Sequence, residues 1–167
     1  MTSYQVDECL NSKKLVRACA EEGLVNVRRC PERLKQCDDP VVLQDVLPSE
    51  WSLVTTDREI HFEHGEFIPA EHSGIVIVAT CQSPRTLGIK DVISILRKFK
   101  AAFPDWHAVS PRNSVMEITE QSAEVWRVVD GIAQRIGLFE FNALGWQDSM
   151  RSLLAQNASR NQQIETD

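Results

Sequence analysis

The chain has 167 residues, of which 43% are hydrophobic and 25% are charged. This length suits one domain with its own hydrophobic core, and the composition excludes a wholly disordered chain. The net charge of −6 argues against a protein that coats nucleic acid through general basicity. It does not exclude a metal-dependent nuclease, whose site needs carboxylates.

The charged residues are unevenly distributed along the chain. Residues 11–35 hold seven bases and three acids, residues 36–80 hold nine acids and one base, and residues 85–112 hold six bases and two acids. The simpler interpretation is a set of solvated helix faces. The sharper interpretation is an acidic site between basic walls.

No apolar stretch approaches the roughly 20 residues that a membrane-spanning helix needs, and residues 1–8 lack the basic and apolar regions of a secretory signal. We therefore expect a cytoplasmic protein with no membrane partner. The cysteines include no C-x-x-C pair and fit no common zinc template, which favours reduced and mostly buried thiols. They are Cys9, Cys19, Cys30, Cys37 and Cys81.

The N-terminal half alternates strand patterns with helix patterns. An amphipathic pattern with Gly23 at its end predicts a helix over 12–22. Asp39-Pro40 combines an N-cap residue with a proline favoured at the first helical position, and so predicts the start of a second helix. The apolar run 74–79 is typical of a strand covered on both faces. Further strands are predicted over residues 3–6, 24–28 and 51–56.

The C-terminal half begins with the clearest helix pattern, an apolar stripe over 89–103. Residues 114–119 and 123–128 alternate apolar and polar side chains around a short turn, which predicts a β-hairpin. Beyond residue 129 the pattern weakens, and we expect a short helix over 148–156 followed by a frayed polar tail.

Strands that alternate with helices predict an α/β fold, with a central, mostly parallel sheet between two layers of helices and a C-terminal β-hairpin and extension. We expect a domain over residues 1–129 and a partly flexible extension over residues 130–167. Ligands of parallel sheets gather beyond the carboxyl ends of the strands. Candidate functional residues should therefore follow the predicted strands.

Acidic residues follow two of these strands. Asp7 and Glu8 follow the first predicted strand, Asp57 and Glu59 follow the third, and Asp39 can face the same rim from the start of its helix. Converging carboxylates repel one another and normally hold a cation unless they are protonated, and oxygen ligands suit Mg²⁺ or Mn²⁺. Such an ion can activate water for phosphodiester hydrolysis. The alternative is that these acids are turn residues and that Asp39 is only a helix cap.

Four segments carry a resemblance to a known family. They are Val6-Asp7-Glu8-Cys9-Leu10, Asp38-Asp39-Pro40-Val41-Val42-Leu43, Leu53-Val54-Thr55-Thr56-Asp57-Arg58-Glu59-Ile60 and Gly74-Ile75-Val76-Ile77-Val78. Together they resemble a PIN-like domain, nearest to the minimal PIN-like toxins of toxin–antitoxin loci, the VapC-like ribonucleases. The resemblance covers residues 3–103, or 3–128 with the hairpin, and the segment around Thr55 is its most specific part.

The resemblance implies a three-layer α/β/α PIN-like fold and a metal-dependent ribonuclease, the toxin of a toxin–antitoxin pair. By matching position, Asp7, Asp39 and Asp57 would hold Mg²⁺ or Mn²⁺. Thr55 would fix the last acid by a hydrogen bond. The implied partners are an RNA substrate, a small antitoxin protein and a second copy of the chain.

The remaining candidates are further acids and bases around that site. Glu8 and Glu59 would serve as outer ligands or orient water. RNA would run along basic residues of segments 13–35 and 85–100 into the acidic site. The bases assigned to RNA binding are Lys13, Lys14, Arg17 and Arg58.

Departures from the family pattern keep a second hypothesis open, a degenerate PIN-like module that binds RNA or a protein partner without catalysis. Cys9 stands where the family usually has Asn, and Glu59-Ile60-His61-Phe62 stands where an Asp-Phe is more usual. The helical Glu that larger PIN nucleases add has no visible counterpart. A purely structural α/β protein is the third hypothesis.

Histidines and tryptophans offer weaker signals. Three histidines lie within residues 61–72, which we interpret as a polar loop, because no His or Cys spacing there fits a zinc template. The four tryptophans could stack the bases of a single-stranded RNA. Core packing is favoured for Trp51 and Trp126, and the better candidates for surface contact are Trp106 and Trp146.

Overall fold

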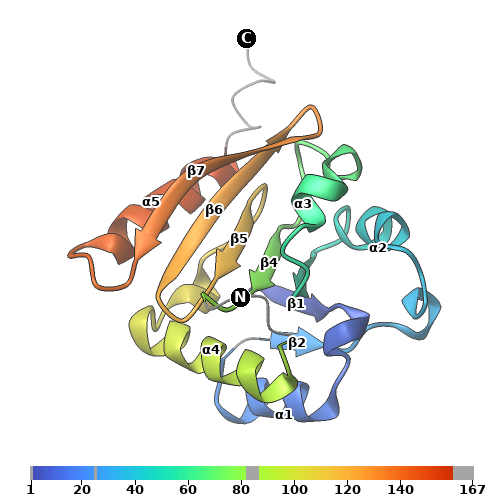
Figure 1. The fold of residues 1–167 in the computed structure, drawn as a ribbon, viewed down its shortest axis with the longest axis horizontal. Coiled ribbons are helices and arrows are strands. Elements are labelled where there is room, and N and C mark those ends of the chain that lie inside the picture. The colour runs from blue at the N-terminus through green and yellow to red at the C-terminus, as the bar shows by residue number, and fades with distance from the viewer. Residues whose placement is uncertain (1, 25, 82–86, 160–167) are drawn as a thin grey trace.

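The computed structural model describes residues 2–24, 26–81 and 87–159, in which seven strands form one sheet with helices on both faces (Figure 1). The strand order is β2-β1-β3-β4-β5-β6-β7, in which the first five are parallel and the last two antiparallel. The predicted α/β class with a mostly parallel sheet is confirmed. The strands are β1 (Ser3–Val6), β2 (Asn26–Arg28), β3 (Trp51–Thr55), β4 (Ile75–Val78), β5 (Val115–Ile118), β6 (Ser122–Val129) and β7 (Ile132–Glu140). The helices are α1 (Lys13–Glu21), α2 (Asp39–Val46), α3 (Ile60–Glu63), α4 (Ile89–Ala102) and α5 (Trp146–Ser159).

Helix starts follow local capping chemistry. The Ser12 hydroxyl accepts hydrogen bonds from the first turn of α1, as expected of an N-cap. In α2 the N-cap is Asp38, and Asp39 lies in the first turn, so the prediction that Asp39 caps the helix is wrong by one residue. Proline is tolerated throughout the first turn, where backbone N–H groups lack helical partners, and Pro40 therefore could not define the boundary.

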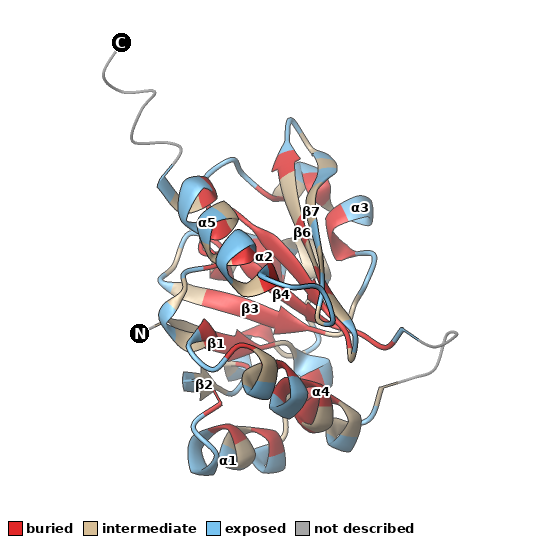
Figure 2. Ribbon diagram, turned by 90° about the vertical axis from the view of Figure 1, so that its left-hand side faces the viewer, coloured by how far each residue is buried: buried red, intermediate tan, exposed pale blue. Residues whose placement is uncertain are grey.

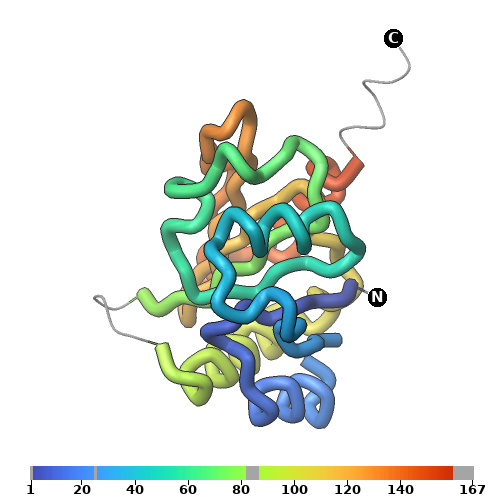
Figure 3. Tube along the Cα trace, turned by 90° about the vertical axis from the view of Figure 1, so that its right-hand side faces the viewer, coloured from blue at the N-terminus to red at the C-terminus, as the bar shows by residue number. Residues whose placement is uncertain are grey.

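β4 lies at the centre of the sheet and separates two hydrophobic cores. Val76 and Val78 pack with residues of α1, α4 and α5, whereas Ile75 and Ile77 pack with residues of α2 and α3. All four side chains are fully buried (Figure 2), and each burial stabilises the fold by about 1.5–3 kcal/mol. The apolar run is therefore a strand covered on both faces, as predicted. The segments on either side of β3, which include α2 and α3, cover one face of the sheet (Figure 3).

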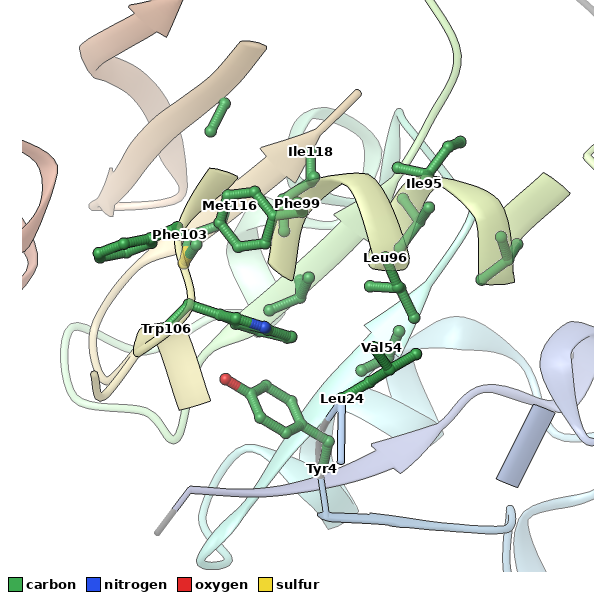
Figure 4. Close-up of a cluster of buried hydrophobic side chains, with 14 of the residues drawn as sticks. Tyr4, Leu24, Val54, Ile95, Leu96, Phe99, Phe103, Trp106, Met116 and Ile118 are labelled. Atoms are coloured by element: carbon green, nitrogen blue, oxygen red, sulfur yellow. The ribbon is translucent and has the colours of Figure 1, made fainter. Parts of the chain in front are cut away.

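Aromatic rings fill much of the larger core, between the sheet and α4 (Figure 4). Trp106 packs against Tyr4 and Phe99, with ring centroids 5.6 and 5.2 Å away, and Trp146 packs 4.7 Å from Phe141. Trp106 and Trp146 are only 3% and 4% exposed, so the interpretation that these two are the better candidates for surface contact is wrong. Their neighbouring loops look polar in sequence, but tertiary packing turns both rings inward.

The C-terminal segment completes the sheet and the core. β7 pairs with β6 along its length, and α5 places Met150 and Leu154 in the larger core. The predicted hairpin is present as β5 and β6. The short helix predicted over 148–156 lies within α5. Residues 160–167, most of the expected frayed tail, lie outside the described residues. Within the described ranges, no helix has the length and apolar character needed to cross a membrane.

Candidate functional site

Two of the predicted acids lie at the carboxyl ends of adjacent strands. Asp7 directly follows β1, and Asp57 lies two residues after β3. These strands are parallel neighbours, with Val6 opposite Val54, and β2 lies on the other side of β1. The strand order therefore changes direction between the two acids. In open α/β sheets such a switch point is where ligands bind.

Thr55, the last residue of β3, joins the two acids. Its buried hydroxyl donates to Asp7 Oδ2 at 2.9 Å and accepts from the Asp57 backbone N–H at 3.2 Å. Asp7 Oδ1 also accepts the Glu8 N–H at 2.8 Å, and Asp57 Oδ1 accepts the Glu59 N–H at 3.0 Å. Both carboxylates are thus oriented by hydrogen bonds. We call Asp7, Asp39 and Asp57 together the acidic rim.

Asp39 reaches this rim from the first turn of α2. Burial raises the pKa of Asp39, and the negative charges of Asp7 and Asp57 raise it further. His64 Nε2 lies 3.4 Å from Asp39 Oδ2 and opposes that rise. Three carboxylates from distant parts of the sequence are therefore close enough to repel one another.

The remaining residues of the predicted site have other roles in the fold. The Glu8 carboxylate accepts the backbone N–H of Gln36 at 2.7 Å and braces the loop before α2. Glu59 contributes its backbone N–H to Asp57, as described above. The Cys9 thiol lies 3.8 Å from Asp7 Oδ2 and 3.5 Å from Thr56 Oγ1. Partial desolvation by neighbouring groups and the charge of Asp7 raise the pKa of Cys9, which keeps this thiol neutral and a weak donor beside the rim.

The donor chemistry of the rim suits a hard cation, since all three acids offer carboxylate oxygens. The side-chain arrangement is less favourable: among the described residues, no group of three or more His, Cys, Asp or Glu side chains is placed so that it could hold a metal ion. Both oxygens of Asp7 already accept hydrogen bonds. In this conformation the acids converge without forming a closed set of ligands.

Basic residues border the rim. Lys13, Lys14 and Arg17 are exposed on α1, which begins just after the first acid. Arg58 lies across the end of the sheet: its guanidinium pairs with Glu117 at 2.6 Å and donates to the Thr80 carbonyl at 3.0 Å. Arg58 is therefore already paired with a carboxylate, whereas the three bases of α1 are open to solvent.

The second predicted basic wall, over 85–100, is only partly available. Arg97 pairs with Glu22, and Lys100 donates to the Glu22 and Gly23 carbonyls at 2.8 and 2.7 Å. Both bases thus bind the C-terminal end of α1, which is the end remote from the rim. Residues 85 and 86 of this wall lie outside the described residues.

Residues 60–63 form α3 instead of the predicted loop. His61 is 1% exposed, and its ring lies 4.0 Å from that of Phe62 and 5.0 Å from that of Trp126. Burial lowers the pKa of His61 to about 4, against the opposing charge of Asp57. A helix of four residues is too short to show a 3.6-residue period, so the sequence carried no sign of this aromatic cluster.

Two further predictions on side-chain burial need correction. Trp51 and Trp126 are half-buried rather than in the core, and the Arg28 guanidinium lies 4.1 Å from the Trp51 ring. All five cysteines are free thiols, but only Cys19 and Cys30 are buried. The expectation of reduced thiols agrees with the structure, and the expectation that most are buried is wrong.

Comparison of the chain with models of protein families, with curated proteins and with solved structures finds no match. The acidic rim is therefore interpreted from its own geometry and chemistry.

Proposed function

We propose that this chain is a PIN-like, Mg²⁺- or Mn²⁺-dependent ribonuclease, and that Asp7, Asp39 and Asp57 are the residues that would hold the ion. One observation carries the proposal: Thr55 links two oriented carboxylates at the switch point of the parallel sheet. Bound there, the ion would activate a water molecule and neutralise charge on the leaving oxygen.

Other side chains of this protein would orient the carboxylates and bind the RNA. The Thr55 hydroxyl sets the orientation of Asp7, so that part of the carboxylate geometry exists before substrate arrives. Lys13, Lys14 and Arg58 would contact RNA phosphates on either side of the rim. Such contacts position the strand without reading its sequence.

The toxin role, the antitoxin partner and the homodimer belong to the same proposal, because they follow from the PIN-like resemblance. The acidic rim supports them only indirectly.

A second candidate function, a non-catalytic PIN-like module, has specific support of its own. The described side chains form no closed set of metal ligands, and Cys9 places a neutral thiol against Asp7. Under this hypothesis the rim would bind RNA or a protein partner without hydrolysis. The variant Cys9→Asn, which introduces an amide donor at this position, would then gain Mn²⁺ affinity over the parent protein.

The test is cleavage of single-stranded RNA with Mn²⁺ by the wild-type chain, Asp57→Asn and Asp130→Asn. Asp130 is exposed in the turn between β6 and β7, where its φ of 51° suits asparagine equally well, so it is the matched control. We expect cleavage by the wild type and by Asp130→Asn only. Equal cleavage by all three proteins would refute the proposed site.

A further inference from the structure

A partly exposed pair of aromatic rings lies beside the proposed site. Phe62, on α3, is 50% exposed, and its ring stands edge-on to that of Trp126, on β6, with centroids 5.0 Å apart at 87°. His61 closes the cluster beneath them. Large aromatic side chains are usually buried, so half exposure of Phe62 leaves a flat apolar surface open to a ligand.

Two arginines flank this surface on the same face of the sheet. Glu117 on β5 is opposite Glu124 on β6, which places the two carboxylates side by side. Arg58 pairs with the first at 2.6 Å, and Arg135 lies 3.6 Å from the second. Arg135 is also directly opposite Trp126 across the β6–β7 ladder. The side chains of Arg58 and Arg135 are 47% and 51% exposed, so a charged ligand could approach both, although each is already paired with a carboxylate.

The cluster also contains polar atoms without partners. Among the described residues, His61 Nδ1, His61 Nε2 and Trp126 Nε1 are buried and make no hydrogen bond. Because these atoms lie below the surface, they do not select a ligand in this conformation. A base of a single-stranded nucleic acid offers a flat face to the half-exposed Phe62 ring and a phosphate to each flanking guanidinium, so it is the ligand class that fits this combination.

We propose that Phe62 and Trp126 form a stacking subsite for one base of a single-stranded RNA. The strand would pass from this subsite toward the acidic rim, because α3 begins three residues after Asp57 and the charge of Asp57 acts on His61 in the same cluster. The choice of RNA rests on the proposed function. The stacking contact itself does not require catalysis.

The experiment measures binding without cleavage. The parent protein carries Asp57→Asn and is titrated into a fluorescein-labelled eight-nucleotide RNA of mixed sequence in EDTA, with fluorescence anisotropy as the readout. Phe62→Ala, Phe62→Leu and Phe62→Trp are compared in this background. Leu144→Ala is the matched control, since Leu144 is fully exposed in the loop before α5.

We expect Phe62→Ala and Phe62→Leu to weaken binding about tenfold or more, and Phe62→Trp and Leu144→Ala to retain it. Leucine keeps apolar area but has no ring, so its loss of affinity would separate stacking from simple hydrophobic contact. Unchanged affinity of Phe62→Ala, or no RNA binding by the parent, would overturn the subsite. Self-association that depends on Phe62 in sedimentation, without RNA binding, would overturn it in favour of a protein interface.

These outcomes are separable from those of the proposed ribonuclease. If the wild type cleaves RNA and Phe62→Ala binds it normally, only the subsite fails. If the wild type and Asp57→Asn behave alike in the cleavage assay but binding depends on the Phe62 ring, the ribonuclease fails and the subsite stands as part of an RNA-binding module.

Discussion

His72 makes the stability of this fold depend on pH in the weakly acidic range. The imidazole is buried in the segment before β4, and its Nδ1 accepts the Gly74 backbone N–H at 3.1 Å. Burial, helped by the positive charge of Arg112, lowers the pKa of His72 from 6.5 to about 4. As the pH falls below 6.5, the unfolded chain therefore binds a proton that the folded chain does not. This contribution of His72 to the free energy of unfolding is complete above about pH 6.5 and is lost as the pH falls toward 4.

The size of this loss follows from the same two pKa values. At about 1.4 kcal/mol per unit, the interval from 6.5 to about 4 corresponds to about 3 kcal/mol of unfolding free energy. By pH 5, about 2 kcal/mol of this has been lost. His61, whose pKa is also lowered to about 4, adds a loss of the same sign.

The variant His72→Asn isolates the contribution of one imidazole. An asparagine side chain accepts the N–H two residues ahead, as in an Asx turn, and so can keep the bond to Gly74 without titrating. Urea unfolding of both proteins at pH 7, 6 and 5 gives the measurement, and His61 cancels because both proteins contain it. We expect the wild type to lose about 2 kcal/mol more than His72→Asn between pH 7 and pH 5. Parallel losses in the two proteins would refute the assignment of a neutral, buried His72.

Three further predictions concern the rim and one turn. Without metal, Asp39→Asn should raise the free energy of unfolding by less than about 1 kcal/mol, because it removes repulsion within a solvent-accessible acid cluster. The same variant should show a smaller gain in melting temperature when Mn²⁺ is added. Gly74→Ala should lower the free energy of unfolding by about 2 kcal/mol or more, since its Cβ would lie 2.4 Å from the Pro111 carbonyl oxygen at a φ of +110°. Gly145→Ala, with no atom within 4 Å of its Cβ, should cost about 1 kcal/mol in the same urea titration. Thr55→Val should lose about 1–2 kcal/mol and weaken Mn²⁺ binding in calorimetry, and unchanged Mn²⁺ affinity would contradict its orienting role.

The sequence predicted those elements whose local pattern matches their tertiary surroundings. The run Ile75–Val78 is apolar at every position because both of its faces are covered, and Ser12 marks α1 because its hydroxyl caps the first turn. β7 escaped detection for the opposite reason. α5 and α3 each contact only part of β7, so its side chains stay partly or fully exposed. A register shift against Val125 and Trp126 also leaves Ile136 unpaired and breaks the two-residue period.

The same distinction applies to the candidate site. Asp7 and Asp57 could be predicted because their position after a strand is a sequence feature with a spatial consequence in a parallel sheet. The aromatic cluster could not, since Phe62 and Trp126 meet across 64 positions of sequence through a helix of four residues. The bond between Glu8 and Gln36 is likewise a tertiary contact, and it turns a predicted site residue into a brace.

Strand order, more than any local segment, determines where the acidic rim forms. β2 lies outside β1, so the chain must cross back over β1 to reach β3, and α2 is that crossover. A crossover helix between parallel strands begins at the edge where the preceding strand ends, which brings Asp39 to the same edge as Asp7 and Asp57. Their mutual repulsion is thus a consequence of topology. It is partly offset by the hydrogen bond from the Thr55 hydroxyl to Asp7 and by the contact of the His64 imidazole with Asp39. A bound cation would remove that repulsion directly, which is why the stability of this chain should respond to Mn²⁺.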